Sequence, residues 1–195
     1  QSALARERPA ADYRETLEAC QRATQRMRRL VESLLALARL DAGQEPLHRA
    51  ECDLARIVTD CLELIRPLAA ARRIQIHTDL PETIFEGDLE RLSQVVTNLL
   101  GNAIDYNHDG GEIRVVTQRE NGTAMLSVSN TGPGISAEDL PHIFERFHRA
   151  DKARAAGHSG LGLAITRAIV EAHGGSIHAA SEEGKGATFA VRLPS

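Results

Sequence analysis

Residues 89–106, with the sequence LERLSQVVTNLLGNAIDY, constrain this chain most, because they carry two periodic faces. One face is apolar at steps of three and four, which predicts a helix packed on a core: Leu89, Leu92, Val96, Leu99 and Ala103. On another face the amides Gln94, Asn98 and Asn102 follow at four-residue spacing, and Tyr106 extends the line. Amides coordinate and hydrogen-bond without titrating, which suits a neutral site for Mg²⁺ and phosphate oxygens. The spacing alone is more often that of a solvated helix face.

Composition limits the classes of protein to which the chain can belong. Its 195 residues, 42% of them hydrophobic, suffice for one domain plus an appendage. A formal net charge of -4 argues against a nucleic-acid partner. Cys20, Cys52 and Cys61 lack metal or redox spacing, as is typical of reduced thiols in a cytosolic protein. No apolar run reaches the roughly 18 residues that span a bilayer, so we expect a cytoplasmic segment without membrane contact.

A seam of apolar and small residues runs through residues 1–43 at alternating steps of four and three. Its positions are Tyr13, Leu17, Cys20, Thr24, Met27, Val31, Leu34 and Ala38. Leu30, Leu35 and Leu37 widen the apolar face toward the end of the helix. We therefore expect a bundle-forming helix whose neighbours come from outside the chain or from a second copy. Asp41-Ala42-Gly43 predicts its end.

Residues 44–195 read as a separate domain in which helices and hairpins segregate. Strands are expected near residues 49–52, 74–78, 83–86, 113–117, 124–128, 176–181 and 187–193, and a further helix over 160–173. Leu80-Pro81 predicts a turn from which 83–86 returns beside 74–78, and Asn121-Gly122 predicts a hairpin. Asp53 and Asp88 are expected to cap helices. The pattern predicts an α+β fold with a mixed, largely antiparallel sheet covered on one face by helices.

Three glycine clusters are spaced as a nucleotide pocket requires. They read NTGPGI at 130–135, GHSGLGL at 157–163 and GKGAT at 184–188. The first lets the backbone pass close to a flat ligand, and the second lets a lid hinge before a helix whose amino end can face phosphates. Each cluster alone is typical of an ordinary turn. Their order together with the amide column is far more specific.

In this order the motifs resemble the ATP-binding domain of sensor histidine kinases, which belong to a superfamily with DNA gyrase and Hsp90. The resemblance covers nearly the whole chain, with an N box at 98–106, an F box at 144–147 and glycine boxes at 130–135, 160–163 and 184–189. The first helix, ending LVESLLALARLDAG, is similar to the second helix of the family's dimerisation and phosphoacceptor domain. The resemblance implies a two-layer α/β sandwich of the Bergerat type in 44–195, preceded by the bundle helix in 1–43.

The resemblance also implies a role for each motif residue. Asn102 would ligate the Mg²⁺ that bridges the ATP phosphates, with Asn98 as a second polar contact, and Tyr106 would pack on adenine. Asn130 would read the adenine amino group, supported by Thr188. The other pocket contacts would be Gly132, Gly134, Ile135, Gly160, Leu161, Gly162 and Leu163. Arg149, with Lys152 and Arg154 in the lid, would neutralise phosphate charge.

The chain departs from the family pattern at three points. Asn130 stands where the family usually has Asp, and since a charged hydrogen bond is the stronger one, Asn130→Asp is expected to raise ATP affinity. Asp105 stands where the family has Lys or Arg, which puts an anion near the phosphate contacts. None of the eight His lies in an acceptor motif, so the phosphoacceptor is expected upstream of Gln1.

The favoured function is that of an autokinase core, which passes the γ-phosphoryl group of ATP to a His of the same protein's acceptor helix. A response regulator would then receive the group, and the full-length protein would be a homodimer anchored in the inner membrane upstream of this chain. A gyrase-like ATPase is the main alternative, but its water-orienting Glu is replaced by Asn98. A degenerate nucleotide-binding regulator and an anti-sigma-type Ser kinase also stay open.

Overall fold

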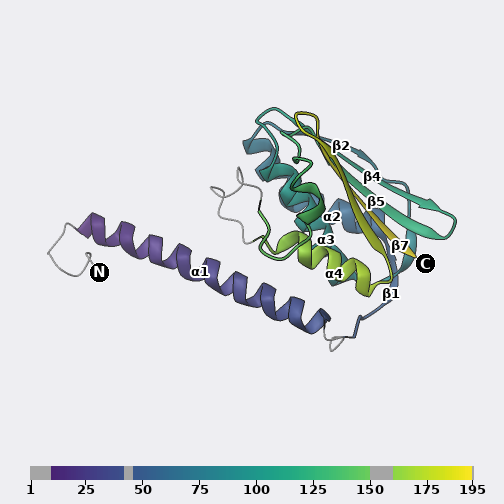
Figure 1. Cartoon of the computed structure of the whole chain (residues 1–195), viewed down its shortest axis with the longest axis horizontal. Coiled ribbons are helices and arrows are strands. Elements are labelled where there is room, and N and C mark those ends of the chain that lie inside the picture. Colours follow the sequence, from purple (N-terminus) through teal and green to yellow (C-terminus); the bar gives the residue numbers. More distant parts are fainter. Residues whose placement is uncertain (1–9, 42–45, 150–159, 195) are drawn as a thin grey trace.

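The computed structural model describes residues 10–41, 46–149 and 160–194. A long helix leads into a two-layer domain (Figure 1). The helices are α1 (Ala10–Asp41), α2 (Leu54–Ala71), α3 (Leu89–Asp105), the 3-10 helix η2 (Leu140–His142) and α4 (Gly162–Ala172). The strands are β1 (Ala50–Asp53), β2 (Gln75–Asp79), β3 (Ile84–Gly87), β4 (Glu112–Glu120), β5 (Thr123–Asn130), β6 (Ser176–Glu182) and β7 (Gly186–Pro194). Among the described residues no helix has the length and apolarity needed to cross a membrane.

The main sheet has five strands in the order β2-β4-β5-β7-β6. Strands β2 and β4 run parallel, and the other neighbours are antiparallel. Helices α2, α3 and α4 lie on one face of the sheet, and its other face is open (Figure 1). Alternate residues of the strands point into the helical layer and are almost fully buried, including Ile113, Val115, Leu126, Val128 and Val191. The predicted two-layer α+β architecture is therefore confirmed.

The turn between β4 and β5 forms as the sequence indicates. Asn121 and Gly122 have φ angles of 51° and 78°, so both residues are left-handed. This is the conformation that a two-residue hairpin turn requires, and Asn followed by Gly adopts it most easily. The hairpin carries Asn130 at the far end of β5, beside the helical layer.

The prediction for β3 is wrong in its pairing, although the strand exists. Strand β3 does not return beside β2 but pairs antiparallel with β1 in a separate two-stranded sheet. Thr83 directs the chain there, because its N–H donates to Asp53 Oδ1 at 2.8 Å and its carbonyl accepts from Leu54 N at 3.0 Å. The same Asp53 carboxylate caps α2 by accepting from Ala55 N. Strand β2 is an edge strand of the main sheet, and it pairs in parallel with β4 and not with β3.

Helix α3 begins at a buried cap. Asp88 Oδ1 accepts from Arg91 N at 3.1 Å and Oδ2 accepts from His48 N at 2.9 Å, while Asp88 N donates to His173 Nε2 at 3.0 Å. Burial raises the pKa of Asp88, but the backbone hydrogen bonds from Arg91 and His48, together with the charges of Arg91 and His173, hold that pKa below the ordinary 3.8. The predicted cap is thus confirmed, and it joins α3 to α4 and to the segment that follows α1.

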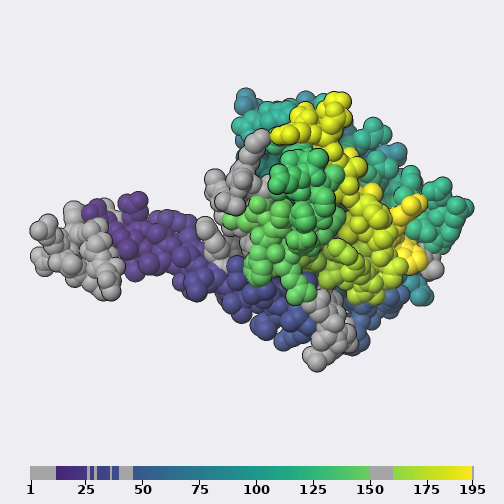
Figure 2. Space-filling model, in the orientation of Figure 1, coloured from purple at the N-terminus to yellow at the C-terminus, as the bar shows by residue number. Residues whose placement is uncertain are grey.

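Helix α1 is divided into a docked part and a projecting part. Near its C-terminal end, Leu37 is 2% exposed and Leu30 and Leu34 pack against the domain core. Farther toward the amino end, Leu17 and Met27 are 68% and 69% exposed. Figure 2 shows the end of α1 against the domain and its beginning extending away. The domain itself therefore covers the C-terminal part of the stripe, and the apolar side chains toward the amino end stay exposed.

Candidate nucleotide-binding site

Two amides of the predicted column differ sharply in their hydrogen bonding. Asn98 Nδ2 donates to Gly162 O at 3.2 Å and lies 3.4 Å from Thr166 Oγ1, so this side chain joins α3 to the start of α4. Asn102, one turn farther along, is half-buried on the same side of α3. Its side chain makes no hydrogen bond to any described residue, which leaves the amide oxygen available to a ligand.

Close main-chain approaches surround the end of this column. A Cβ atom at Gly132 would lie 1.9 Å from Tyr106 O, and a Cβ atom at Gly186 would lie 1.9 Å from Asn130 O. Neither position therefore accepts another residue without a shift of backbone. The first and third glycine clusters thus pack the end of α3 against the ends of β5 and β7.

Asn130 forms a latch between these elements. Its Nδ2 donates to Tyr106 O at 3.2 Å, and its Oδ1 accepts from Ala187 N at 3.1 Å. One partner is an acceptor and the other a donor, so the orientation of the amide is fixed. Aspartate would supply no donor and would place a carboxylate oxygen beside the Tyr106 carbonyl. The structure therefore reverses the expectation that Asn130→Asp strengthens nucleotide binding.

Tyr106 and Arg149 lie near one another at the mouth of the site. Burial raises the pKa of Tyr106 above its ordinary value of 10, the Arg149 charge lowers it, and the Asp105 charge raises it. Tyr106 is still 38% exposed, so its ring is accessible. Phe147 N donates to Gly160 O at 3.0 Å, which joins the two ends of the segment between them. Lys152 and Arg154, predicted as lid cations, lie outside the described residues.

The start of α4 supplies apolar walls beside Asn98. Leu161 is fully buried, Leu163 packs against the core, and Gly162 carries the carbonyl that Asn98 contacts. Leu161 is the N-cap residue of this helix, and its side chain makes no capping hydrogen bond. Across the site, Ile135 N donates to Ser181 Oγ at 2.8 Å, and Gly134 lies against the main chain of Glu182. Asn98 therefore joins the start of α4 to α3, whereas Gly134 and Ile135 lie against the end of β6.

Thr188 does not join this group. In the register of β5 and β7, Asn130 is opposite Ala187, and Thr188 is opposite Ser129. Successive residues of a strand point to opposite faces, so Thr188 and Asn130 point to different faces of the sheet. Thr188 lines a hollow of about 580 Å³ at the strand ends, and Arg114, Ser129 and Asn130 also border it. The expected support of an adenine contact by its side chain is corrected for this reason.

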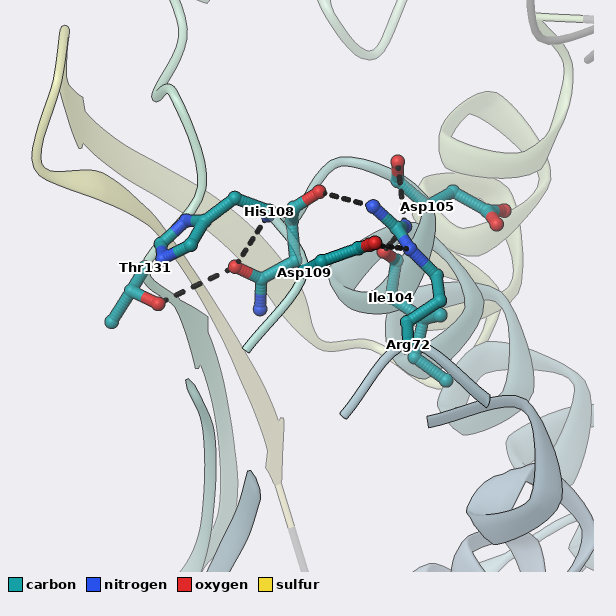
Figure 3. Close-up of polar contacts among 7 residues, drawn as sticks. Arg72, Ile104, Asp105, His108, Asp109 and Thr131 are labelled. Carbon is teal, nitrogen blue, oxygen red and sulfur yellow. Dashed lines mark hydrogen bonds and ion pairs between the residues drawn. The ribbon is translucent and has the colours of Figure 1, made fainter. Parts of the chain in front are cut away.

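Asp105 lies at the C-terminal end of α3 with its side chain exposed. Its carbonyl accepts from Arg72 Nη1 at 3.3 Å, and its carboxylate points away from the guanidinium (Figure 3). Sequence reasoning missed Arg72 entirely, because this residue belongs to no motif and comes from the end of α2. A basic residue directly after a helix was the only signal available.

Metal binding by the protein alone has little support. The described residues contain no group of three or more His, Cys, Asp or Glu side chains that could hold a metal ion. Cys20, Cys52 and Cys61 are free thiols. Asn102 offers a single neutral oxygen, which suits Mg²⁺ only when phosphate oxygens and water complete the shell. The site therefore fits a metal ion that arrives with a phosphorylated ligand.

Comparison with known proteins agrees with this geometry. Residues 87–195, more than half of the chain, match the family described as histidine kinase-, DNA gyrase B- and HSP90-like ATPase. Residues 2–43 match the His kinase A (phospho-acceptor) domain. The probable sensor histidine kinase TcrY of Mycobacterium tuberculosis is 45% identical over 175 residues, 88% of this chain and 36% of that protein. The sensor histidine kinase RppB of Synechocystis is 36% identical over 182 residues, 91% of this chain and 40% of that protein.

A solved structure shows the same fold over almost the entire chain. The crystal structure of full-length ShkA in complex with AMPPNP superposes with a TM-score of 0.81 and 29% identity, over 96% of this chain and 40% of that one. The chain thus spans about 40% of the length of these relatives or less. The fold, the ordered motifs and these matches agree, and the chain belongs to the histidine kinase-, DNA gyrase B- and HSP90-like ATPase family, in its sensor histidine kinase branch.

Proposed function

We propose that this chain is the cytoplasmic catalytic core of a two-component sensor histidine kinase. It binds Mg·ATP and transfers the γ-phosphoryl group to a His that lies outside this chain. That group then passes to an Asp of a response regulator. Support comes from the family match and from relatives that are named sensor histidine kinases.

The side chain of Asn102 carries the proposal. It lies half-buried one turn before Tyr106, whose N–H donates to the main-chain carbonyl of Asn102, and no described residue satisfies its side-chain amide. Buried or half-buried polar groups usually have partners, so an amide left open within a cluster of motif residues indicates a ligand contact. A Mg²⁺ ion would screen the charge of the phosphates, and Asn102 would hold it through the amide oxygen.

The remaining residues contact different parts of the nucleotide. Tyr106 packs on the base, and Asn130 reads its amino group with the second lone pair of Oδ1. The apolar and close-packed walls are Ile135, Leu161, Leu163, Gly132, Gly134, Gly160 and Gly162. Arg149, which acts on Tyr106 from the edge of the lid, is near enough to turn toward the phosphates when nucleotide enters. Asn98 positions the start of α4 and adds a polar contact.

Phosphoryl transfer to His fits this site better than hydrolysis. In transfer, an acceptor ring nitrogen bonds to the γ-phosphorus while the bond to the bridging oxygen breaks and ADP leaves. Rapid hydrolysis needs a carboxylate that orients water, and Asn98 occupies the expected place with its Nδ2 committed to Gly162. The chain therefore positions ATP and neutralises its charge without activating water.

The partners follow from the two parts of the chain. We assign residues 1–43, which include α1, to a dimerisation bundle as its C-terminal segment, and residues 44–195 to the ATP-binding domain. The exposed apolar side chains Leu17, Met27, Val31 and Leu35 on α1 are the surface for a homodimer contact in the full-length protein. Segments outside this chain anchor that protein in the inner membrane.

Two measurements test the proposal in sequence. Equilibrium titration of the chain with Mg·ATP should show micromolar to low millimolar binding. Incubation with γ-labelled ATP should leave the chain unlabelled, and an added acceptor-helix segment should then gain acid-labile phosphate. No binding would favour the degenerate regulator, rapid release of phosphate would favour the ATPase, and acid-stable label on the chain would favour the Ser kinase.

A further inference from the structure

The C-terminal end of α3 carries partial negative charge that no basic residue of its own last turn offsets. The last carbonyl groups of a helix have no partner within the helix, and this end carries partial negative charge. A Lys or Arg in the last turn usually offsets that charge, but α3 has none there and ends in Asp105. The end of the helix therefore needs a cation from elsewhere, at the place where Asn102 and Tyr106 lie.

Arg72 supplies that cation from the end of α2. Its Nη1 donates to the carbonyls of Ile104 and Asp105, and its Nη2 donates to Asn107 O at 2.6 Å. Its Nε donates to Asp109 Oδ1 at 3.0 Å (Figure 3). One guanidinium group therefore holds three carbonyls and a carboxylate, although its side chain is 33% exposed. A planar fork of donors suits this task, whereas a Lys ammonium cannot reach the same set.

The backbone of Arg72 is fixed as well. Its N–H donates to Ala69 O at 3.1 Å, and its carbonyl accepts from Gly110 N at 2.9 Å. The next strand begins with Gln75 N donating to Gly111 O at 2.9 Å. The main chain and the guanidinium of Arg72 thus both bind the loop that follows α3, which restricts the movement of the side chain.

The turn after α3 is held on its other side by the residues that surround the nucleotide site. Asn107 is 6% exposed, its Nδ2 donates to Glu112 O at 3.0 Å, and its Oδ1 accepts from Thr131 Oγ1 at 3.3 Å. Tyr106 O accepts from Asn130 at the same level. Arg72 on one side and Asn130 and Thr131 on the other therefore hydrogen-bond to the same turn, residues 104–107, which contains Tyr106.

We propose that Arg72 is a positioning residue for nucleotide binding, which acts by fixing the C-terminal end of α3 so that Asn102 and Tyr106 meet the ligand. Arg72 itself touches no part of the nucleotide. The inference rests on the proposed function, because it assigns Arg72 a role in the same site. It also explains how the chain retains an ordered helix end with Asp105 in the last turn.

The primary experiment compares Arg72→Gln, Arg72→Lys and Arg66→Gln in the full chain. Arg66 lies exposed on the same helix, so its substitution removes an equal charge without touching α3. Titration with Mg·ATP should show about tenfold weaker binding for Arg72→Gln, an intermediate loss for Arg72→Lys and wild-type affinity for Arg66→Gln. The binding is measured at a temperature where circular dichroism shows all the variants folded.

A spectroscopic measurement separates positioning from general stabilisation. The chain has two Tyr and no Trp, so Tyr13→Phe leaves Tyr106 as the single phenol that titrates. The charges that act on this phenol are those of Arg149 and Asp105, so a change caused by Arg72 reports movement or exposure of the ring. In this background Arg72→Gln should lower the pKa of Tyr106 toward its ordinary value, and Arg66→Gln should leave it unchanged.

The outcomes are distinct. Weaker ATP binding together with a lowered Tyr106 pKa in the folded variant supports the proposal. Wild-type affinity with an unchanged titration overturns it, and so does a loss of stability that leaves both quantities unchanged. If the unmodified chain binds no nucleotide, the proposed function fails, and the Tyr106 titration alone decides whether Arg72 positions this turn.

Discussion

The two ends of α3 are fixed in opposite ways. At the amino end, Asp88 caps the helix within its own sequence by accepting from Arg91 N, three residues away. At the C-terminal end the capping group is Arg72, which lies 32 residues before the carbonyl of Ile104 that it contacts. A cap of the first kind can be read from sequence, and a cap of the second kind exists only after the chain has folded.

The difference also separates stability from ligand binding. The amino end is buried among His173, the backbone of His48 and the end of α4, far from the amides of the site. The C-terminal end borders the nucleotide site and carries Asn102 and Tyr106 near the surface. Substitutions at the amino end should therefore affect mainly unfolding, and substitutions at the C-terminal end should affect mainly affinity.

Asn102→Ala should produce the largest effect and the clearest separation of the two ends. It removes the open amide without touching the apolar face of α3, so Mg·ATP should bind at least about a hundredfold more weakly while thermal unfolding is little changed. Gln94→Ala, an amide on the same helix near the amino end, is the matched control. Equal ATP affinity in Asn102→Ala and the unmodified chain would remove the assignment of Asn102.

Asp88→Ala should give the converse result. The substitution leaves two backbone N–H groups without their acceptor in a site where Asp88 is 6% exposed. We expect the free energy of unfolding to fall by about 2 kcal/mol, measured with urea, and the ATP affinity of the folded protein to be unchanged. Asp88→Asn, which keeps one of the two acceptor oxygens, should lose less. A drop in affinity comparable with that of Asn102→Ala would contradict the separation.

Asn130→Asp tests the latch between Tyr106 and β7. Aspartate keeps the acceptor for Ala187 N but replaces a donor to Tyr106 O with a negative oxygen, so the turn should loosen. We expect about fivefold weaker ATP binding by calorimetry. Asn130→Ser, a smaller neutral side chain, serves as the comparison, since it removes the latch without adding charge. Tighter binding in Asn130→Asp would show that the charge at the adenine contact outweighs the latch.

The ends of α3 should respond to opposite changes of pH. Burial lowers the pKa of His173 below 6.5, the bond to Ile169 O and the Asp88 charge raise it, and the Arg49 charge lowers it. Because the unfolded chain binds the proton more readily, this contribution to stability is present above about pH 6.5 and is lost on acidification. The pKa of Tyr106 is raised, so its contribution is present below about pH 10 and is lost as the pH rises through the folded value.

Matched variants isolate these two contributions. Between about pH 8 and 5.5 the urea midpoint should fall more for the unmodified chain than for His173→Gln. Between about pH 9 and 10.5 it should fall more for the unmodified chain than for Tyr106→Phe. Identical pH profiles for a variant and the unmodified chain would mean that the residue contributes nothing to the pH dependence of that end.

What the sequence predicts well are contacts between near neighbours. The caps at Asp53 and Asp88, the turn at Asn121-Gly122 and the alternation of the strands all depend on spacings of a few residues, and all are present. The ordered glycine motifs could identify the family because main-chain atoms lie so close to Gly132 and Gly186 that a Cβ atom does not fit there.

What the sequence does not predict are contacts between distant segments. The pairing of β3 with β1 depends on Thr83 reaching Asp53, and the docking of α1 depends on Leu37 finding the domain core. The face of Thr188 depends on the register with β5, where a shift of one residue reverses every side chain. The contacts of Arg72 are hard to predict for two reasons: its partners are distant in sequence, and they are main-chain carbonyls, which every residue type has.

Asp105→Lys should have the smallest effect. Its sign tests how far Arg72 already offsets the negative charge at the C-terminal end of α3. A cation in the last turn ordinarily stabilises a helix by a few tenths of a kcal/mol, and repulsion from Arg72 is limited because side chain 105 points away from it. With the anion removed, ATP should bind about twofold more tightly at low salt, and the difference should vanish at high salt because an exposed charge is screened. In the Arg72→Gln background the same substitution should restore more stability than in the unmodified chain, since the helix end then lacks its other cation. Equal gains in both backgrounds would mean that position 105 and Arg72 act on the helix end independently.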